Sequence, residues 1–165
     1  MKNFYKFIFV FIMLLVAGSC GNKTSFSPAS KGSAGNYSTV LKIKDKILNV
    51  EVASSSQAMA LGLGGRKSMK ENEGMLFVFR APAKPDFWMK DMHFDLDLIW
   101  VANKKIVGID AGVKAPASEC LGPGADCGLR LYSPLQPVDQ VLEVNAGWAQ
   151  KNLVHAGDGV YLPNE

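Results

Sequence analysis

The sequence is poor in the residues that most often carry metal or nucleophilic chemistry. Its 165 residues include three cysteines and two histidines. Neither His93 nor His155 stands beside a recognisable serine elbow, so the sequence gives little support to nucleophilic catalysis. Cys120 and Cys127 have no second pair of Cys or His nearby to complete four ligands, which argues against a zinc site.

An excess of either charge is also missing. The chain has 18 basic and 15 acidic residues, and Lys2 and Lys6 belong to a segment that we expect to be removed. The rest is near neutral and has no clustered basic footprint, so we expect no nucleic-acid partner. The apolar stretch 7–16 is too short to span a bilayer as a lasting helix.

The first twenty residues have the pattern of a secretory signal. After a basic start and the apolar stretch come Ala17, Gly18 and Ser19, followed by Cys20. A cysteine directly after small residues resembles the lipobox of bacterial lipoproteins, in which that cysteine becomes the acylated N-terminus. We therefore expect a lipoprotein-type signal peptide over residues 1–19 and lipidation of Cys20. The alternatives are an ordinary cleaved signal and an uncleaved anchor.

Residues 20–36 are rich in Ser, Gly, Lys and Asn. Such a composition cannot bury enough apolar surface to order itself, so we interpret it as a flexible, lipid-anchored tether to one β-rich domain of residues 37–165. The sequence thus predicts an exported protein, anchored in the bacterial cell envelope and facing the periplasm or the exterior. Gly21 stands where an acidic residue often retains lipoproteins at the inner membrane.

Hydrophobic patterning predicts a mainly β fold with a minor α+β character. Residues 75–79 leave no position for a solvated face, which is typical of a strand buried on both sides. We expect a small barrel-like or sandwich domain of about seven short strands with two short helices. The expected elements are hairpins at 40–52 and 94–111, a short helix that starts at 54–56, carries Leu63 and is ended by the glycines of 62–65, a loop at 80–86, an irregular segment at 114–137, a strand at 138–144, a helix at 146–153 and a strand at 160–162.

Cys120 and Cys127 lie in a segment rich in Gly and Pro. Outside the reducing cytosol, oxidation to a disulfide is the default for such a pair. Closing so short a loop contributes roughly 2.5 kcal/mol on the loop-entropy model. We therefore predict a disulfide between Cys120 and Cys127, with a metal pair as the alternative.

Several separate motifs resemble one prokaryotic family in the same order along the chain. They are residues 73–79 (EGMLFVF), 87–90 (FWMK), 96–99 (LDLI), 141–148 (VLEVNAGW) and 157–158 (GD). The family is domain of unknown function 192, and the resemblance covers about residues 41–162. It implies a compact, mostly β, barrel-like domain that is often exported and has no established biochemical activity.

The chain departs from that family's pattern at two places. The family usually has an Arg and a Gly-Leu-Met near the first helix, where this chain reads Gly62-Leu63-Gly64-Gly65-Arg66. A small hydroxyl residue is commoner where Met92 stands. The region around Gly62 and Met92 is therefore where we expect this member to differ in ligand.

Three acids are candidates for catalysis, namely Glu73, Asp97 and Glu143. A carboxyl group enclosed by aromatic side chains has a raised pKa and can act as a general acid or base. Two such groups can cleave a glycosidic bond. The alternative, which we favour, is that Asp95 is solvated and Asp97 accepts backbone or Trp N–H hydrogen bonds that fix its strand.

Met89, Met92 and His93 are candidates for a metal site, because thioether and imidazole ligands suit copper. In a strand, Met89 and Met92 point to opposite faces, although a bend can reunite them. Core packing also accounts for Met89 beside Trp88. No metal is assigned on this basis, and we expect no cofactor.

Phe87, Trp88 and Trp148 are candidates for binding, since aromatic rings can floor a groove that stacks sugars or peptide side chains. For Trp148 a groove and the core are equally compatible with the pattern, whereas Trp88 is expected in the core. The sequence favours a non-catalytic binding or accessory module of the envelope, held to the membrane through Cys20, with an unknown envelope ligand or protein as partner. The alternatives are a hydrolytic enzyme with paired carboxylates and a copper-handling protein.

Overall fold

The computed structural model describes residues 36–122 and 127–162. The expected signal peptide, Cys20 and the expected tether up to residue 35 lie outside the described residues. Within the part of the chain that is described, no helix is long and apolar enough to cross a membrane.

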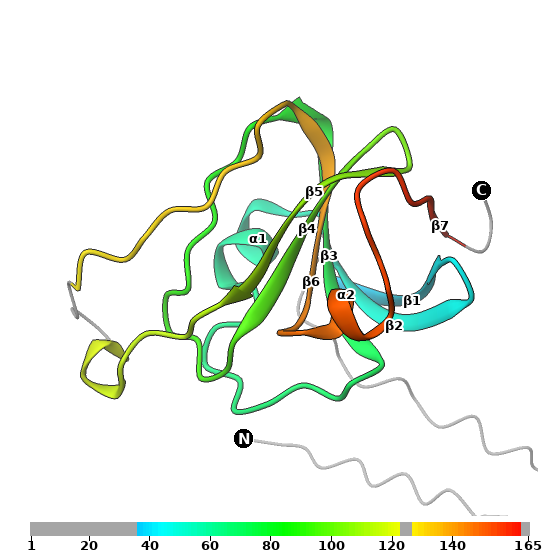
Figure 1. The fold of residues 1–165 in the computed structure, drawn as a ribbon. Coiled ribbons are helices and arrows are strands. Elements are labelled where there is room, and N and C mark those ends of the chain that lie inside the picture. Colours follow the sequence, from blue (N-terminus) through cyan, green and yellow to red (C-terminus); the bar gives the residue numbers. More distant parts are fainter. Residues whose placement is uncertain (1–35, 123–126, 163–165) are drawn as a thin grey trace, which may run out of the picture. The chain divides into compact units, whose positions relative to one another are not determined.

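One curled sheet of seven strands forms a half-barrel and carries two short α-helices (Figure 1), so the predicted fold class is confirmed. The strand order is β5-β4-β6-β3-β2-β1-β7. The strands are β1 Asn36–Ile43, β2 Lys46–Ala53, β3 Glu73–Ala83, β4 Leu96–Ala102, β5 Lys105–Val113, β6 Val138–Asn145 and β7 Val160–Tyr161. The helices are α1 Ser56–Leu61, α2 Trp148–Lys151 and the 3₁₀ turn η1 Ser118–Cys120.

The sheet is mixed, because one pair of strands is parallel. β2 and β3 run parallel and are joined through α1, whereas all the other neighbouring strands are antiparallel. A parallel connection needs a crossover element, and α1 is that element. The antiparallel hairpins are tight: Asn103 and Lys104, between β4 and β5, have φ values of 50° and 60°, as a two-residue hairpin turn requires.

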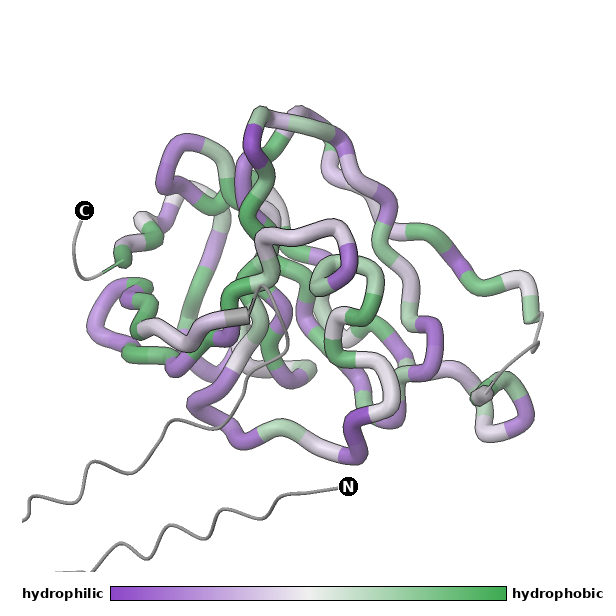
Figure 2. Tube along the Cα trace, turned by 180° about the vertical axis from the view of Figure 1, so that it is seen from behind, coloured by the Kyte–Doolittle hydropathy of each residue, from purple (hydrophilic) through white to green (hydrophobic). Residues whose placement is uncertain are grey.

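The middle of the sheet has protein on both faces. On one face, α2 packs through Trp148 and Ala149 against Leu76 and Leu142, and we call this the α2-side core. On the other face, α1 packs through Ala58 in what we call the α1-side core, which also contains Met75, Phe77, Leu98 and Trp100. Because successive side chains of a strand point to opposite faces, an uninterrupted apolar run such as 75–77 supplies both cores. In Figure 2 the trace is hydrophobic along most of the strands and hydrophilic at many of the turns.

The predicted loop at residues 80–86 is wrong in part, because β3 continues to Ala83 and includes Pro82. The pairing of β3 with β6 shifts register between Val78 and Ala83. Proline has no N–H to donate, so a strand tolerates it where the regular ladder is interrupted. The last helix is also shorter than predicted: it begins at Trp148, after Gly147 in the left-handed conformation, and ends at Lys151.

Asp97 fixes β4 to its surroundings on the α2 side. Its side chain is fully buried. Oδ1 accepts hydrogen bonds from the backbone N–H groups of Gly112 (2.8 Å) and Gly147 (3.0 Å), and Oδ2 accepts one from Ala149 (3.0 Å). One carboxylate thus ties β4 to the end of β5 and to the first turn of α2, as the structural interpretation of this acid expects.

We expect Asp97→Asn to lower the free energy of unfolding by about 2–3 kcal/mol, because an amide nitrogen cannot accept an N–H and leaves a buried donor without a partner. Urea denaturation measures the change. Asp110→Asn is the matched control: among the described residues, the Asp110 carboxylate accepts one hydrogen bond, from Trp100 Nε1 at 2.7 Å, which an amide oxygen can still accept. Equal destabilisation by the two variants would contradict this role of Asp97.

Candidate functional site

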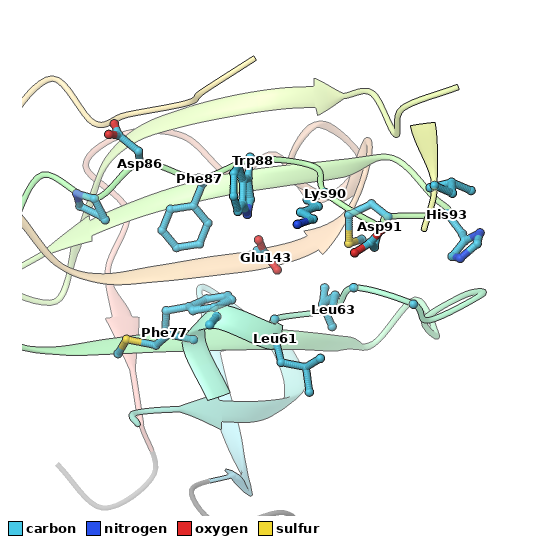
Figure 3. A pocket seen from close by; sticks show the side chains of 18 of the residues that line it. Leu61, Leu63, Phe77, Asp86, Phe87, Trp88, Lys90, Asp91, His93 and Glu143 are labelled. Atoms are coloured by element: carbon cyan, nitrogen blue, oxygen red, sulfur yellow. The ribbon is translucent and has the colours of Figure 1, made fainter. Parts of the chain in front are cut away.

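A pocket of about 930 Å³ opens on the α1 side of the sheet. One wall is formed by α1 and the glycine-rich loop 62–65, the other by residues 85–93, and β3 and β6 lie between them (Figure 3). The apolar side chains that line it are Met59, Ala60, Leu61, Leu63, Phe77, Phe79, Pro85, Phe87, Trp88, Met92 and Leu121. The ionisable side chains are Asp86, Lys90, Asp91, His93 and Glu143.

The α1 wall follows from local sequence signals. Ser55 caps the helix, with its hydroxyl oxygen accepting a hydrogen bond from the Ala58 backbone N–H (3.2 Å). Gly62 ends the helix at a positive φ of 51°, a conformation that glycine adopts without strain. A helix this short presents Leu61 at the pocket rim, where 62% of its surface is exposed.

The opposite wall is held by Phe87. Its backbone pairs with Tyr132 through two hydrogen bonds of 2.9 and 2.8 Å. Its ring packs edge-on against Phe77, with ring centroids 4.9 Å apart, and against Trp100 at 5.6 Å. These contacts fix an aromatic ring in the pocket wall, as the binding hypothesis for Phe87 requires.

The expectation that Trp88 lies in the core is wrong. Trp88 lines the pocket and is 54% exposed, because its neighbour Phe87 occupies the inward position. The ammonium group of Lys90 lies 5.5 Å from the centroid of the Trp88 ring. Trp148, in contrast, is buried in the α2-side core. This core is on the other face of the sheet, so Trp148 does not line the pocket.

Asp91 joins the two walls. It has a φ of 56° and lies within a turn in which the Met92 N–H donates to the Met89 carbonyl (3.2 Å). The Asp91 carbonyl accepts from the Gly65 N–H (2.8 Å), and its carboxylate accepts from the Gly122 N–H (3.0 Å). The glycine-rich loop, the 85–93 wall and the loop next to Cys120 are therefore connected at one residue.

The predicted disulfide between Cys120 and Cys127 is confirmed, with Cα atoms 5.8 Å apart. Leu121 and Gly122 follow its first cysteine and line one end of the pocket. The bridge closes a short loop beside this end.

Glu143 stands in the floor of the pocket. On β6 it lies opposite Met75 of β3 and Leu98 of β4, so its side chain is on the α1 side of the sheet. Figure 3 shows its carboxyl group between Phe87 and Trp88 on one side and Phe77 and Leu61 on the other. Only 6% of its surface is exposed.

No hydrogen bond joins the Glu143 carboxyl to any of the described residues. Burial raises its pKa from 4.5 to about 8, and the positive charge of Arg66 opposes the rise only in part. Arg66 itself donates from both terminal guanidinium nitrogens, Nη1 and Nη2, to the carboxylate of Glu51. Glu143 is therefore mostly protonated at neutral pH when nothing occupies the pocket.

The structure separates the three candidate catalytic acids. Asp97 is opposite Val144, one position along from Glu143, and so faces the other side of the sheet. Glu73 is at the start of β3, where Lys70 pairs with its carboxylate at 3.0 Å and lowers its pKa. No two of these acids face each other across the pocket; Asp86 and Asp91 are the acids that line it with Glu143.

The candidate copper ligands are also divided. Met89 and Met92 both pack in the α1-side core, because the turn at 89–92 reunites them, whereas His93 is exposed at the pocket edge. Among the described residues, no three His, Cys, Asp or Glu side chains are grouped as a metal site.

Sequence reasoning missed Met59, Leu61, Phe77, Asp86 and Lys90 as parts of one site. The available signal was the pair of departures from the family pattern. Gly62 and Gly64 lie in one wall and Met92 in the other, so the region in which a ligand difference was expected lines the pocket.

We expect the stability of the wild type to fall as pH rises from 5 to 7. The folded-state pKa of Glu143 exceeds the unfolded value, so between about pH 4.5 and 8 the folded state binds more protons. Glu143→Gln removes this dependence, and its stability relative to wild type should rise by about 1.4 kcal/mol per pH unit in that window. Urea denaturation at several pH values measures it.

Glu73→Gln is the control for this experiment, because the pKa of the Glu73 carboxyl is lowered and not raised. Its stability relative to wild type should fall, not rise, as pH increases through the acid range. A pH-independent difference between Glu143→Gln and wild type would contradict the burial of an unpaired carboxyl.

Two solved structures have a similar fold, and no curated protein matches the chain. A protein from Sinorhizobium meliloti 1021, described as a candidate transcription regulator, matches with a TM-score of 0.68 and 24% identity over 79% of this chain and 98% of its own; at that identity the likeness shows the fold alone. A protein of unknown function from Novosphingobium aromaticivorans DSM 12444 matches with a TM-score of 0.68 and 26% identity over 86% of this chain and 99% of its own.

The motifs described above fall within one family model. The model of domain of unknown function 192 (DUF192), described as an uncharacterized ACR, matches residues 39–162. This range contains all the motifs on which the resemblance was based, as well as the pocket. The chain belongs to the DUF192 family.

Proposed function

We propose that this protein is a non-catalytic binding module of the bacterial cell envelope, anchored by lipid at Cys20, which holds a small molecule in the pocket between α1 and residues 85–93. The observation that carries the proposal is the pocket itself. It has about 930 Å³ of space, predominantly apolar side chains and a few ionisable groups. Sites for small molecules have this size and this mixture of surfaces.

The side chains at the base of the pocket are held in place by the sheet, as a binding site requires. Phe77 and Glu143 come from the two central strands, and Phe87 is fixed between Phe77 and Trp100. Side chains held on strands keep a defined geometry before a ligand arrives. The exposed rim is also apolar, since Leu61 and Trp88 are more than half exposed and stand at its edge.

Binding is favoured over hydrolysis by the placement of the acids. A glycosidase needs two carboxyl groups on either side of the scissile bond. Asp97 is on the other face of the sheet and is saturated by backbone donors. Glu143 therefore lacks the partner with which it was expected to act.

The envelope location is supported by the sequence. Residues 1–19 have the pattern of a lipoprotein signal, and Cys20 follows directly after it. Attachment through several acyl chains gives stable anchoring, whereas one chain gives marginal binding.

A ligand found by screening small molecules against the full-length chain in vesicles should change the fluorescence of Trp88. Leu61→Glu should then weaken binding by about tenfold or more, because it replaces an apolar rim contact by a charge. Leu135→Glu is the matched control, since Leu135 is 97% exposed and is not among the lining residues. Equal affinities of the two variants would rule out this pocket.

The anchor has its own test. Growing cells with an alkyne-bearing fatty acid should label the wild type, and Cys20→Ser should abolish the label and release the protein from the acylated fraction. The Cys120–Cys127 disulfide remains in that variant, so only the candidate acylation site is changed. Undiminished labelling of Cys20→Ser would show that Cys20 is not the acylated residue.

A further inference from the structure

We propose that the ligand of this pocket is an organic ammonium ion, whose charged nitrogen binds the Glu143 carboxylate while its apolar body lies against Phe77, Phe87 and Trp88. This inference rests on the proposed function and names the ligand class. It begins from Glu143, a side chain 6% exposed that points into the pocket (Figure 3) and accepts no hydrogen bond from the described residues.

A buried carboxyl without a partner is costly in its charged form, and a ligand can remove that cost. A primary ammonium group brings a positive charge and three N–H donors to two carboxylate oxygens that have neither. Asp97 shows what the fold does with an acid that serves structure: it surrounds the group with three backbone donors. Glu143 has been left without such donors in the pocket floor.

The charges of the pocket favour a cation. Among the described residues, the lining contains three acids, Asp86, Asp91 and Glu143, and one basic side chain of the lysine or arginine type, Lys90. Opposite charges placed in a cleft with apolar walls attract each other more strongly than they do in water.

The aromatic wall favours a cation as well. The face of an aromatic ring carries a negative potential that attracts ammonium groups, most strongly for tryptophan. The Trp88 ring already has the Lys90 ammonium at 5.5 Å from its centroid. The contact between Lys90 and Trp88 shows that the ring at the pocket rim can lie against an ammonium group.

An anionic ligand is disfavoured by the backbone of the glycine-rich loop. Glycine loops bind phosphates through free N–H groups. Here Gly62 donates to the Ala58 carbonyl, Gly64 to that of Leu61 and Gly65 to that of Asp91, at distances of 2.9, 3.1 and 2.8 Å. These amides are already used within the wall.

The proton balance of binding follows from the state of Glu143. The empty pocket holds a neutral carboxyl at pH 7, since burial raises the pKa of Glu143 to about 8. The ammonium ion enters with its proton, Glu143 ionises, and the displaced proton passes to solvent. Affinity should therefore rise about tenfold per pH unit between pH 6 and 7.5, with close to one proton released per ligand bound.

Other titrating groups near Glu143 do not supply this dependence in the same way. Arg66 keeps its charge throughout this range, and α1 contains no ionisable side chain. On β4, Asp97 faces away, and on β3, Glu73 is paired with Lys70. The segment 85–93 contributes Asp86, Lys90, Asp91 and His93 to the lining. A variant of Glu143 is therefore needed to assign the released proton to this carboxyl.

The test compares three probes with the same body: 2-phenylethylamine, 2-phenylethanol and 3-phenylpropanoate. Isothermal titration with the full-length chain in phosphatidylcholine vesicles, in buffers of different ionisation enthalpy, measures affinity and proton release. The amine should bind at least tenfold more tightly than the alcohol at pH 7.5, and the carboxylate most weakly. Glu143→Gln should remove both the preference and the proton release, and Glu73→Gln should keep them.

The outcomes separate this inference from the proposed function. Equal binding of amine and alcohol, with both perturbing Trp88, would overturn the ammonium ligand and leave a small-molecule pocket. Proton release that persists in Glu143→Gln would also overturn it, since the proton would then come from a group other than Glu143. Binding of none of the three probes, while a screened ligand of another class occupies the pocket, would overturn the ligand class alone.

Discussion

The structure depends on a constraint set by its central strands: β3, β4 and β6 are covered by protein on both faces. Protein keeps water from most of both faces, so a polar side chain enclosed there needs a partner or is driven to its neutral form. Hydrophobic runs meet this constraint without difficulty. The two buried acids, Asp97 and Glu143, do not meet this constraint by themselves. The organisation of the two faces follows from whether each acid finds hydrogen-bond donors.

Asp97 and Glu143 occupy neighbouring positions of the β4–β6 ladder but face opposite sides of the sheet. On the α2 side, Gly112, Gly147 and Ala149 donate their N–H groups to Asp97, so this acid stabilises the junction of two strands and a helix. On the α1 side, Glu143 finds an opening and no donor among the described residues. One sheet therefore uses the same kind of side chain for structure on one face and presents it to a pocket on the other.

The pocket exists because the α1 side is covered by irregular segments and a short helix, which leave space above the sheet. These segments are not independent of each other, since Asp91 connects the loop at Gly65 with the loop at Gly122. Gly64 lies in this wall where the resemblance expects a methionine, and Met92 lies opposite. Two departures from the family pattern thus meet in the lining, which makes the pocket the part of the domain in which a family member can change its ligand without changing its fold.

Local patterns in the sequence determined the seven strands, the two short helices and the turn at residues 103–104, because the period of the apolar residues and the chemistry of turns are properties of neighbouring residues. They also determined the disulfide pair. The extension of β3 through Pro82 depended on a register shift against β6, which the sequence of one strand does not contain. Tertiary structure alone decided the pocket: which face each acid takes, that Trp88 points outward while Trp148 is buried, and that α1 and residues 85–93 stand on either side of Glu143. These are contacts between segments far apart in the chain. They are set by the register and curl of the sheet, which cannot be read from any single stretch of sequence.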